Sequence, residues 1–222
     1  MERTAIDAVE SAAFGDGVDR RGLTDALDAE HLAVNRYRVP PGEGFPSGLH
    51  AHGDQEEVFV VLDGEATFET LVPRGEAGGD PGATEWEAGE VAVAAGEAIR
   101  FAPGEYQSGR NAGEAELVAL ALGAPRDSED VRIPLACPEC GHGYLRPEAG
   151  GAGDVRLVCP DCDARNAPEG CPDCGSEMRV ALADAERRES PSGDSREVAG
   201  DRPETRVVCP YCGAEAATPF RS

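Results

Sequence analysis

Two histidines and a glutamate lie within a stretch of eight residues, from His50 through His52 to Glu57. Residues i and i+2 of a β-strand point to the same face, so both imidazoles would enter one cavity. Glu57 stands at the start of the apolar run Val58–Leu62, next to a polar turn, where its carboxylate could reach the same cavity. Imidazoles and a carboxylate suit Fe, Mn, Ni, Co, Cu or Zn. The spacing therefore predicts a site for one divalent transition metal.

All eight cysteines fall in four Cys-x-x-Cys pairs. This arrangement favours metal binding over disulfides, because two such pairs supply the four thiolates of a tetrahedral zinc site. A left-handed residue is expected after each pair, where Gly stands three times and Asp163 once. Pairing neighbours predicts two structural zinc sites, the first with Cys137, Cys140, Cys159 and Cys162 and the second with Cys171, Cys174, Cys209 and Cys212.

Three alternatives to this zinc assignment stay open. Crossed pairing of the first pair with the third would interleave two small cores, whereas sequential elements are usually neighbours. A thiol–disulfide centre would need a βαβ context, which this sequence lacks. Iron can occupy a four-thiolate site, as in rubredoxin-like ribbons, but the ligand spacing and the absence of an electron-transfer partner motif favour structural zinc.

Short strand candidates, most of them separated by Gly-bearing turns, fill residues 31 to 125. Many short strands at this spacing argue for an antiparallel barrel or a double-sheet sandwich. A helical turn is expected in Gly22–Glu30, with Thr24 as its N-cap. The strand candidates are His31–Val39, Leu49–His52, Glu57–Leu62, Glu65–Val72, Thr84–Glu87, Glu90–Ala94, Ala98–Ala102 and Ala115–Leu122.

The same stretch carries the motifs of a known family. The cupin pattern G-x5-H-x-H-x4-E-x6-G is matched at every position by Gly44, His50, His52, Glu57 and Gly64. The second cupin pattern, G-x5-P-x-G-x2-H-x3-N, aligns with Gly96, Ala102, Gly104, Gln107 and Asn111 and departs from it at Ala102 and Gln107. The chain thus resembles the cupin superfamily over about residues 30 to 125. This resemblance implies a small jelly-roll β-barrel with one metal site, and a homodimer.

Gln107 stands where the cupin pattern has its fourth ligand, a histidine. An amide oxygen is a harder and weaker ligand than imidazole. The resemblance therefore implies His50, His52 and Glu57 as metal ligands, with Gln107 either ligating through its amide oxygen or holding a metal-bound water. The alternative is a cupin that no longer holds metal.

Changes in composition divide the chain into segments. Residues 1–30 are an acidic lead-in, 31–125 the barrel and 126–135 a polar linker. Residues 136–166 and 167–222 are expected to form two zinc ribbons, the second with a disordered acidic insert at 183–205. The predicted fold class is all-β, a cupin jelly-roll barrel followed by two small zinc-ribbon modules.

The chain of 222 residues has a formal net charge of −23, and all 20 of its basic residues are Arg. Such a composition is typical of a halophilic protein, although a coding bias toward Arg has the same effect. The negative charge argues against nucleic acid and anionic membranes as partners. No secretory signal begins the chain, and no apolar run approaches the roughly 20 residues of a membrane span. The sequence predicts a cytoplasmic protein.

These features predict a metal-binding cupin that binds or transforms a small anionic or carbonyl-bearing metabolite and carries structural zinc ribbons. An enzyme would be a metal-dependent oxygenase or isomerase of the cupin type, and no separate general acid or base can be named. The alternative is a non-catalytic adaptor or regulator whose ribbons contact a protein partner. The intact first motif favours the enzyme, whereas the appended ribbons, which cupin chemistry does not need, favour the adaptor.

Overall fold

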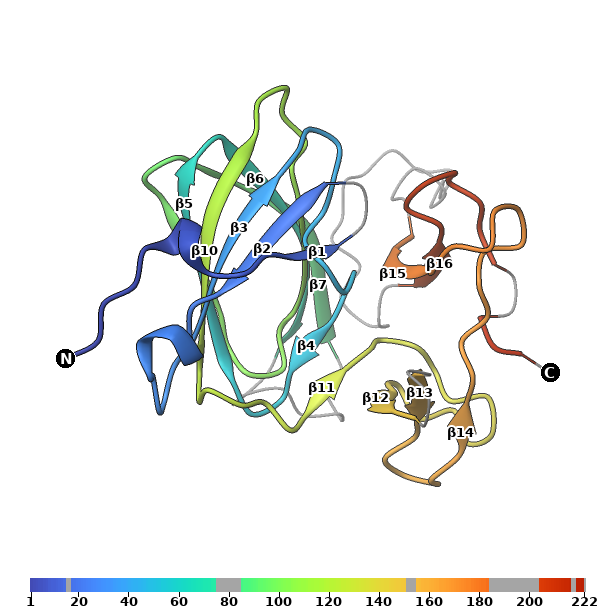
Figure 1. Ribbon diagram of the computed structural model, residues 1–222. Helices are drawn as coiled ribbons and strands as arrows, with labels where there is room; N and C mark the ends of the chain where they lie inside the picture. Colours follow the sequence, from blue (N-terminus) through green and yellow to red (C-terminus); the bar gives the residue numbers. More distant parts are fainter. Residues whose placement is uncertain (15–16, 75–84, 151–154, 184–203, 217–218, 222) are drawn as a thin grey trace.

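The computed structural model describes residues 1–14, 17–74, 85–150, 155–183, 204–216 and 219–221. Regular structure in these ranges is almost entirely β, and the helical part consists of two short 3-10 helices, η1 (Ile6–Ala8) and η2 (Asp25–Leu27). A barrel stands beside two small cysteine-rich modules (Figure 1). No helix in the described ranges is long and apolar enough to cross a membrane.

One side of the barrel is a six-stranded antiparallel sheet in the order β1-β2-β3-β10-β5-β8. Along β10, buried residues alternate with partly exposed ones over the whole strand, as expected where one face of a sheet covers a core. The strands of this sheet are β1 (Ala12–Phe14), β2 (Val18–Gly22), β3 (Ala33–Val39), β5 (Glu56–Asp63), β8 (Ala98–Phe101) and β10 (Leu117–Ala124).

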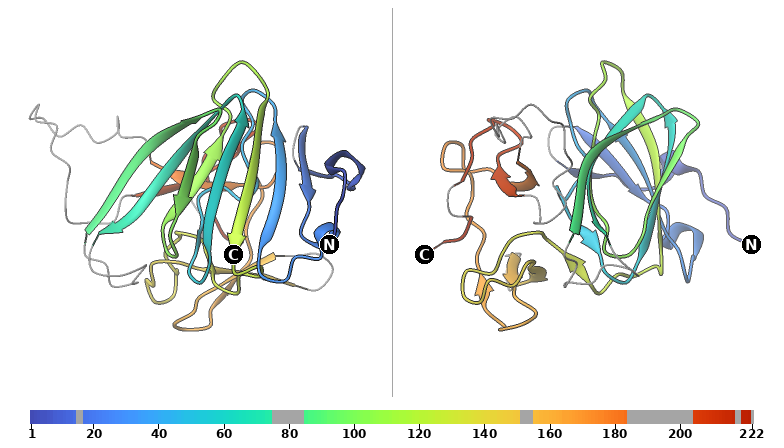
Figure 2. Two further views of the ribbon diagram at one scale, coloured as in Figure 1. Left: turned by 90° about the vertical axis from the view of Figure 1, so that its left-hand side faces the viewer. Right: turned by 180° about the vertical axis from the view of Figure 1, so that it is seen from behind.

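The other side is a three-stranded sheet in the order β7-β6-β9, made of β6 (Glu65–Arg74), β7 (Glu85–Ala94) and β9 (Tyr106–Arg110). The two sheets curve toward one another around a common interior (Figure 2). Phenylalanine and aliphatic side chains form the core between them. Within it, the ring centroids of Phe59 on β5 and Phe68 on β6 are 4.9 Å apart. The predicted fold class is confirmed as an all-β jelly-roll barrel followed by two small modules, each with a four-cysteine cluster compatible with a zinc ribbon.

The sequence predicts separate strands at Thr84–Glu87 and Glu90–Ala94 with a Gly-bearing turn between them at Ala88–Gly89, and this turn is wrong. Strand β7 continues through it, and every residue from Glu85 to Ala94 pairs with a residue of β6. The long ladder with β6 overrides the local turn signal of Gly89, since strand formation depends on pairing as much as on propensity.

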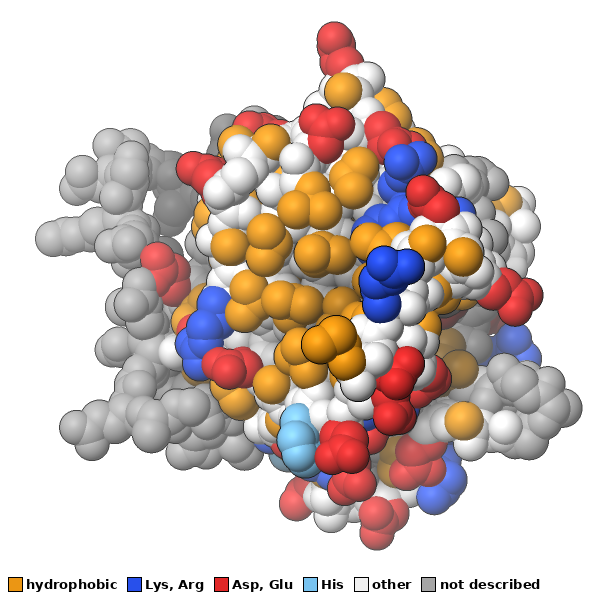
Figure 3. All heavy atoms as spheres, turned by 60° about the vertical axis from the view of Figure 1, so that its left-hand side comes forward, with side chains coloured by type: hydrophobic (Ala, Val, Ile, Leu, Met, Phe, Trp, Pro, Cys, Tyr) orange, Lys and Arg blue, Asp and Glu red, His pale blue; other side chains and the backbone are white. Residues whose placement is uncertain are grey.

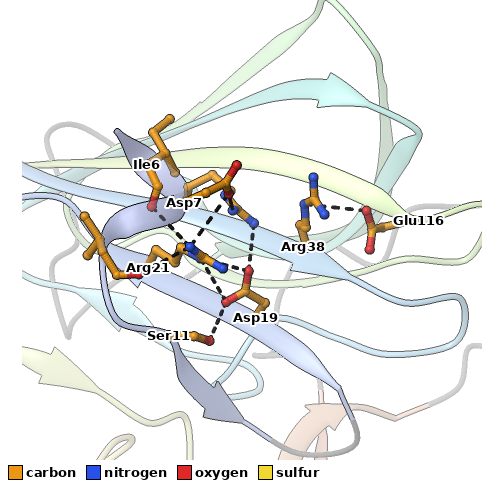
Figure 4. A network of polar contacts seen from close by, with 9 residues as sticks. Ile6, Asp7, Ser11, Asp19, Arg21, Arg38 and Glu116 are labelled. Atoms are coloured by element: carbon orange, nitrogen blue, oxygen red, sulfur yellow. Dashed lines mark hydrogen bonds and ion pairs between the residues drawn. The ribbon is translucent and has the colours of Figure 1, made fainter. Parts of the chain in front are cut away.

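The acidic lead-in joins the barrel through its β1–β2 hairpin, which extends the six-stranded sheet. Arg36 on β3 is 4% exposed and donates to Asp19 on β2 and to Asp7 in η1, both at 2.9 Å. The Ser11 hydroxyl and Arg21 also donate to Asp19, and these contacts hold the pKa of Asp19 below its ordinary value. Figure 4 shows the network, which ties the N-terminal segment to the sheet.

The residues after the barrel pack against it. Strand β11 (Val131–Arg132), within the predicted linker, pairs with β4 (Ala51–His52), and the two modules contain β12 to β14 and the β15–β16 hairpin. Leu49 and Tyr106 of the barrel share a second hydrophobic core with the tail. The remaining strands are β12 (Arg146–Ala149), β13 (Val155–Val158), β14 (Arg165–Asn166), β15 (Arg179–Leu182) and β16 (Thr205–Val208). Apart from its ends, the predicted insert at 183–205 lies outside the described residues.

The outer face of the six-stranded sheet carries an apolar surface (Figure 3). Because Phe59 on β5 and Ala121 on β10 face the core, their neighbours along each strand face outward. The outward side chains of these strands include six large aliphatic ones, none of which is buried: Val58, Val60, Leu62, Val118, Leu120 and Leu122.

Candidate metal centre

His50 and His52 lie on a short segment that pairs with β9. The His50 N–H donates to the Gln107 carbonyl at 3.1 Å, and the Gln107 N–H donates to the His50 carbonyl at 2.8 Å. The His52 carbonyl accepts a further bond from the Gly104 N–H at 2.7 Å. The extended backbone turns both imidazoles to one side, with ring centroids 5.2 Å apart.

Glu57 reaches the imidazoles from β5, in the opposite sheet. Its Oε2 lies 3.9 Å from His52 Nε2. One ligand atom from each of His50, His52 and Glu57 lies within 4.8 Å of the other two. Two donors bound to one ion at roughly 2.1 Å in tetrahedral geometry are about 3.4 Å apart, so small side-chain movements would close the site. The structure thus brings together three of the four residues predicted for the barrel site at the spacing of a metal centre.

Gln107, the fourth predicted residue, faces the same cluster with its amide nitrogen. Its Nε2 donates to Glu57 Oε2 at 3.0 Å and lies 3.5 Å from His50 Nε2. In this rotamer the amide is a hydrogen-bond partner of Glu57, and ligation through its oxygen would require the amide to turn over. A ligand role for Gln107 therefore stays a prediction, while its contact with Glu57 is part of the structure.

Burial favours the neutral forms of all three ionisable groups in the cluster. It raises the pKa of Glu57 to about 7, and the hydrogen bond from Gln107 opposes the shift. It lowers the pKa of His52 to about 4, an effect to which the charge of His50 adds, and it also lowers the pKa of His50. Both imidazoles are therefore neutral at neutral pH, which is the form that binds a metal.

The hydrogen bonds of the two rings differ. His50 Nδ1 lies 2.9 Å from the Gly48 carbonyl oxygen, so this nitrogen carries the proton and Nε2 keeps its lone pair. His52 Nδ1 is buried and has no hydrogen-bond partner among the described residues. Two neutral imidazoles and one carboxylate are a donor set that fits a divalent cation. Burial opposes ionisation of the Glu57 carboxyl group, and a bound cation would stabilise its charged form.

A cavity of about 400 Å³ adjoins the three donors, a size suited to a small metabolite. Tyr37 and Phe59 form part of its barrel wall. Arg20 from β2 and Arg126 from the predicted linker also line it. Sequence reasoning missed both arginines because they lie outside the motif, and no local pattern marks either of them as a cavity residue.

The eight cysteines form two clusters of four, and each cluster joins neighbouring pairs. The described sulfur–sulfur distances are 3.5 and 3.7 Å in the first cluster and 3.4 to 3.8 Å in the second. Thiolates around one zinc at about 2.3 Å would be roughly 3.8 Å apart, so both clusters fit a four-thiolate ion. The first pair does not join the third. As expected, the residue after each pair, including Asp163 with φ 59°, has positive φ.

No protein-family model matches the chain, and no curated protein matches it. Solved structures resemble part of it. Bacillus subtilis oxalate decarboxylase, in a study of its Mn(II) centres, has 19% identity and a TM-score of 0.44, covering 57% of this chain and 30% of that one. A putative sugar phosphate isomerase from Acidithiobacillus ferrooxidans has 22% identity and a TM-score of 0.42, covering 63% and 76%.

A third similar structure is an uncharacterised conserved protein with a double-stranded β-helix domain from Klebsiella pneumoniae. It has 17% identity and a TM-score of 0.41, covering 59% of this chain and 95% of that one. This chain spans less than a third of the oxalate decarboxylase, at 30% of its length.

Proposed function

We propose that the barrel binds one divalent transition metal through His50, His52 and Glu57 and takes a small anionic metabolite into the adjoining cavity. The observation that carries this proposal is the meeting of the three donor atoms, from the His50–His52 segment and from strand β5, within 4.8 Å of one another. The two cysteine clusters would hold zinc in a structural role, since four thiolates leave no open position for a substrate.

Each residue of the barrel site has a distinct task in this proposal. The Gly48 carbonyl fixes the tautomer of His50 so that Nε2 is available to the ion. Gln107 orients the carboxylate of Glu57 through its amide nitrogen. Fe, Mn, Ni, Co, Cu and Zn all suit this donor set, and a bound ion of this kind would polarise a substrate oxygen as a Lewis acid.

The guanidinium groups in the cavity wall, above all that of Arg20, favour an anionic ligand. Arg20 donates through Nε to Asn35 Oδ1 at 3.0 Å, which orients its guanidinium group. Arg126 donates to the Ala29 carbonyl at 3.0 Å, which anchors it at the cavity wall. A guanidinium group presents paired donors that match a carboxylate. Arg126 also pairs with Asp25 at 2.6 Å, and Asp127 lines the same cavity, so Arg20 is the guanidinium group that we assign to the ligand.

Tyr37 links the arginine side of the cavity to the metal side. Burial raises the pKa of the Tyr37 hydroxyl, the charge of Arg20 lowers this pKa, and the charge of Glu57 raises it. Its neutral hydroxyl is therefore available as a hydrogen-bond donor between the two ends of a ligand. A small carboxylic acid with a second oxygen would satisfy both ends.

Elemental analysis and ligand titration test the proposal. The wild-type chain should hold two zinc ions and one further metal, and the double variant H50A/H52A should hold the two zinc ions alone. Malonate should bind the metal-loaded protein in calorimetry, whereas malonamide, its neutral analogue, should not. Arg20→Gln should weaken malonate binding about tenfold while the metal content stays unchanged. An equal metal content in the wild type and H50A/H52A would overturn the proposal.

A further inference from the structure

The segment that carries His50 and His52 has a neighbour on each edge. On one edge it pairs with β9 through Gln107. On the other, Val131 pairs with His52, and the Leu49 N–H donates to the Val180 carbonyl of β15 at 2.8 Å. The cysteine-rich tail therefore completes the hydrogen bonding of the metal-ligand segment.

The contact with β15 lies directly before His50. Gly48 has φ +61°, and a Cβ atom there would lie 3.0 Å from both the Arg179 Cβ and the Val180 oxygen. The carbonyl of this glycine is also the partner of His50 Nδ1, at 2.9 Å. Leu49 has no exposed surface and shares a core with Val180. Strand β15 thus packs against the backbone that orients the His50 ring.

The second cysteine cluster holds β15 in place. The β15–β16 hairpin has only four residues in each strand and stands between the third and fourth Cys-x-x-Cys pairs. A two-stranded hairpin of this length is marginally stable alone, and zinc supplies much of the folding free energy of such modules. The first module shares the second hydrophobic core and reaches the linker through the Ile133–Leu145 bridge and the Arg146–Asp130 ion pair at 2.9 Å. By contrast, the described backbone bond from the residue directly before His50 goes to β15 of the second module.

We infer that the second cysteine centre, Cys171, Cys174, Cys209 and Cys212, positions His50, so that loss of zinc from this centre weakens metal binding in the barrel. The inference rests on the proposed metal binding by His50, His52 and Glu57. It assigns the second module a task beyond stability. The module holds the outer edge of the ligand segment, and zinc in the tail regulates the barrel site.

Matched cysteine variants test this coupling. C174S/C212S removes two exposed thiolates from the second centre, and C140S/C162S removes two exposed thiolates from the first. Mn²⁺ prefers nitrogen and oxygen ligands over thiolates, so its affinity, measured by electron paramagnetic resonance of free Mn²⁺, reports the barrel site. We expect a loss of about tenfold or more in C174S/C212S and of less than threefold in C140S/C162S. Wild-type affinity in C174S/C212S, or an equal loss in both variants, would overturn the inference.

A glycine pair tests the same contact with all eight cysteines intact. Gly48→Ala would drive a methyl group into β15, whereas Gly42 has φ +81° and open space around its Cβ position. The two alanine substitutions therefore carry similar backbone strain, and only the first displaces β15. Mn²⁺ affinity should fall about tenfold in Gly48→Ala and change little in Gly42→Ala. Equal affinities in the two variants would contradict the inference.

Hydrogen exchange separates this inference from the proposed function, because it needs no metal in the barrel. The Leu49 amide, bonded to Val180, should lose about tenfold or more of its protection in C174S/C212S, while amides of Phe59 and Val61 keep theirs. If the wild type binds no Mn²⁺, the proposed function fails, and the exchange result still decides the coupling. Unchanged protection of Leu49 would refute it.

Discussion

At the scale of single residues, Glu57 is the member of the metal centre that titrates near neutral pH. Its pKa is raised to about 7 by burial, while the pKa of His52 is lowered to about 4 and that of His50 is also lowered. A metal entering the site below pH 7 must displace the proton of Glu57, whereas burial already favours the neutral form of both imidazoles.

This difference predicts the pH dependence of metal binding. The apparent Mn²⁺ affinity should rise about tenfold per pH unit between pH 5 and 7, because one proton leaves for each ion bound, and should level off above pH 7. The same shift makes the metal-free barrel less stable as pH rises from 4.5 through about 7, because the buried carboxyl must ionise. Calorimetric titrations in buffers of different ionisation enthalpy measure the proton release. A Glu57→Gln variant with the same pH slope would contradict this assignment.

Gln107 offers a second residue-scale test. It lies at the position of the absent third imidazole, and its amide nitrogen is 3.5 Å from His50 Nε2. Gln107→His should raise Zn²⁺ affinity in the barrel by about tenfold, since imidazole is a better ligand than an amide. Gln107→Ala, as the control, should lower it several-fold because Glu57 loses its donor. Competition with a chromogenic chelator measures both, and a weaker site in Gln107→His would count against this geometry.

The donors of the barrel site were predictable, but the two arginines of its wall were not. His50, His52 and Glu57 follow from spacing because strand periodicity fixes which side chains share a face. Arg20 and Arg126 come from segments that meet only through tertiary contact. The rotamer of Gln107, with its nitrogen toward Glu57, is likewise set by its neighbours and not by its position in the motif.

At the scale of elements, the pairing of β11 with β4 also depends on tertiary contact and could not be predicted from the sequence. Val131 and Arg132 form a strand of two residues after a polar stretch, too short to show a period. The strand exists because the edge of β4 is available to it, and Asp54 fixes the preceding turn by accepting from Ser128 at 2.6 Å and the Glu129 N–H at 2.7 Å. Which Cys-x-x-Cys pairs share a cluster could be predicted, by contrast, because neighbouring pairs have the shortest connections along the chain.

The N-terminal segment gives an element-scale prediction. Arg36, with 5% of its side chain exposed, joins β3 to Asp19 and Asp7. Arg36→Ala should lower the free energy of unfolding by about 2 kcal/mol, because two charge-assisted hydrogen bonds are lost while Asp19 keeps Ser11 and Arg21 as partners. Asp7→Asn should cost less than about 1 kcal/mol, since the Asp7 side chain is 83% exposed. Urea denaturation with excess zinc measures both, and equal losses would show that the network does not hold this segment.

At the scale of the whole molecule, charge and apolar surface are unevenly distributed. The net charge is −23, yet the outer face of β5 and β10 is apolar (Figure 3). Two copies of so acidic a chain repel one another except where charge is sparse, so this face is the surface on which the expected homodimer would form. The homodimer stays a prediction, and sedimentation of the wild type beside Leu120→Arg would test it.

The same charge predicts that salt stabilises the fold. Repulsion among 43 acidic side chains, opposed by 20 arginines, is stronger in the compact chain than in the unfolded one. The screening length falls from about 10 Å at 0.1 M salt to about 3 Å at 1 M, so the melting temperature should rise by roughly 5 °C or more over this range. Replacing the exposed Glu10, Glu65, Glu114 and Glu139 by Lys would bring the net charge from −23 to −15 and should reduce the rise. Scanning calorimetry of both proteins in NaCl with excess zinc measures the difference. The same rise in both proteins would mean that salt acts through solvation of apolar surface and not through charge, since that effect does not depend on net charge.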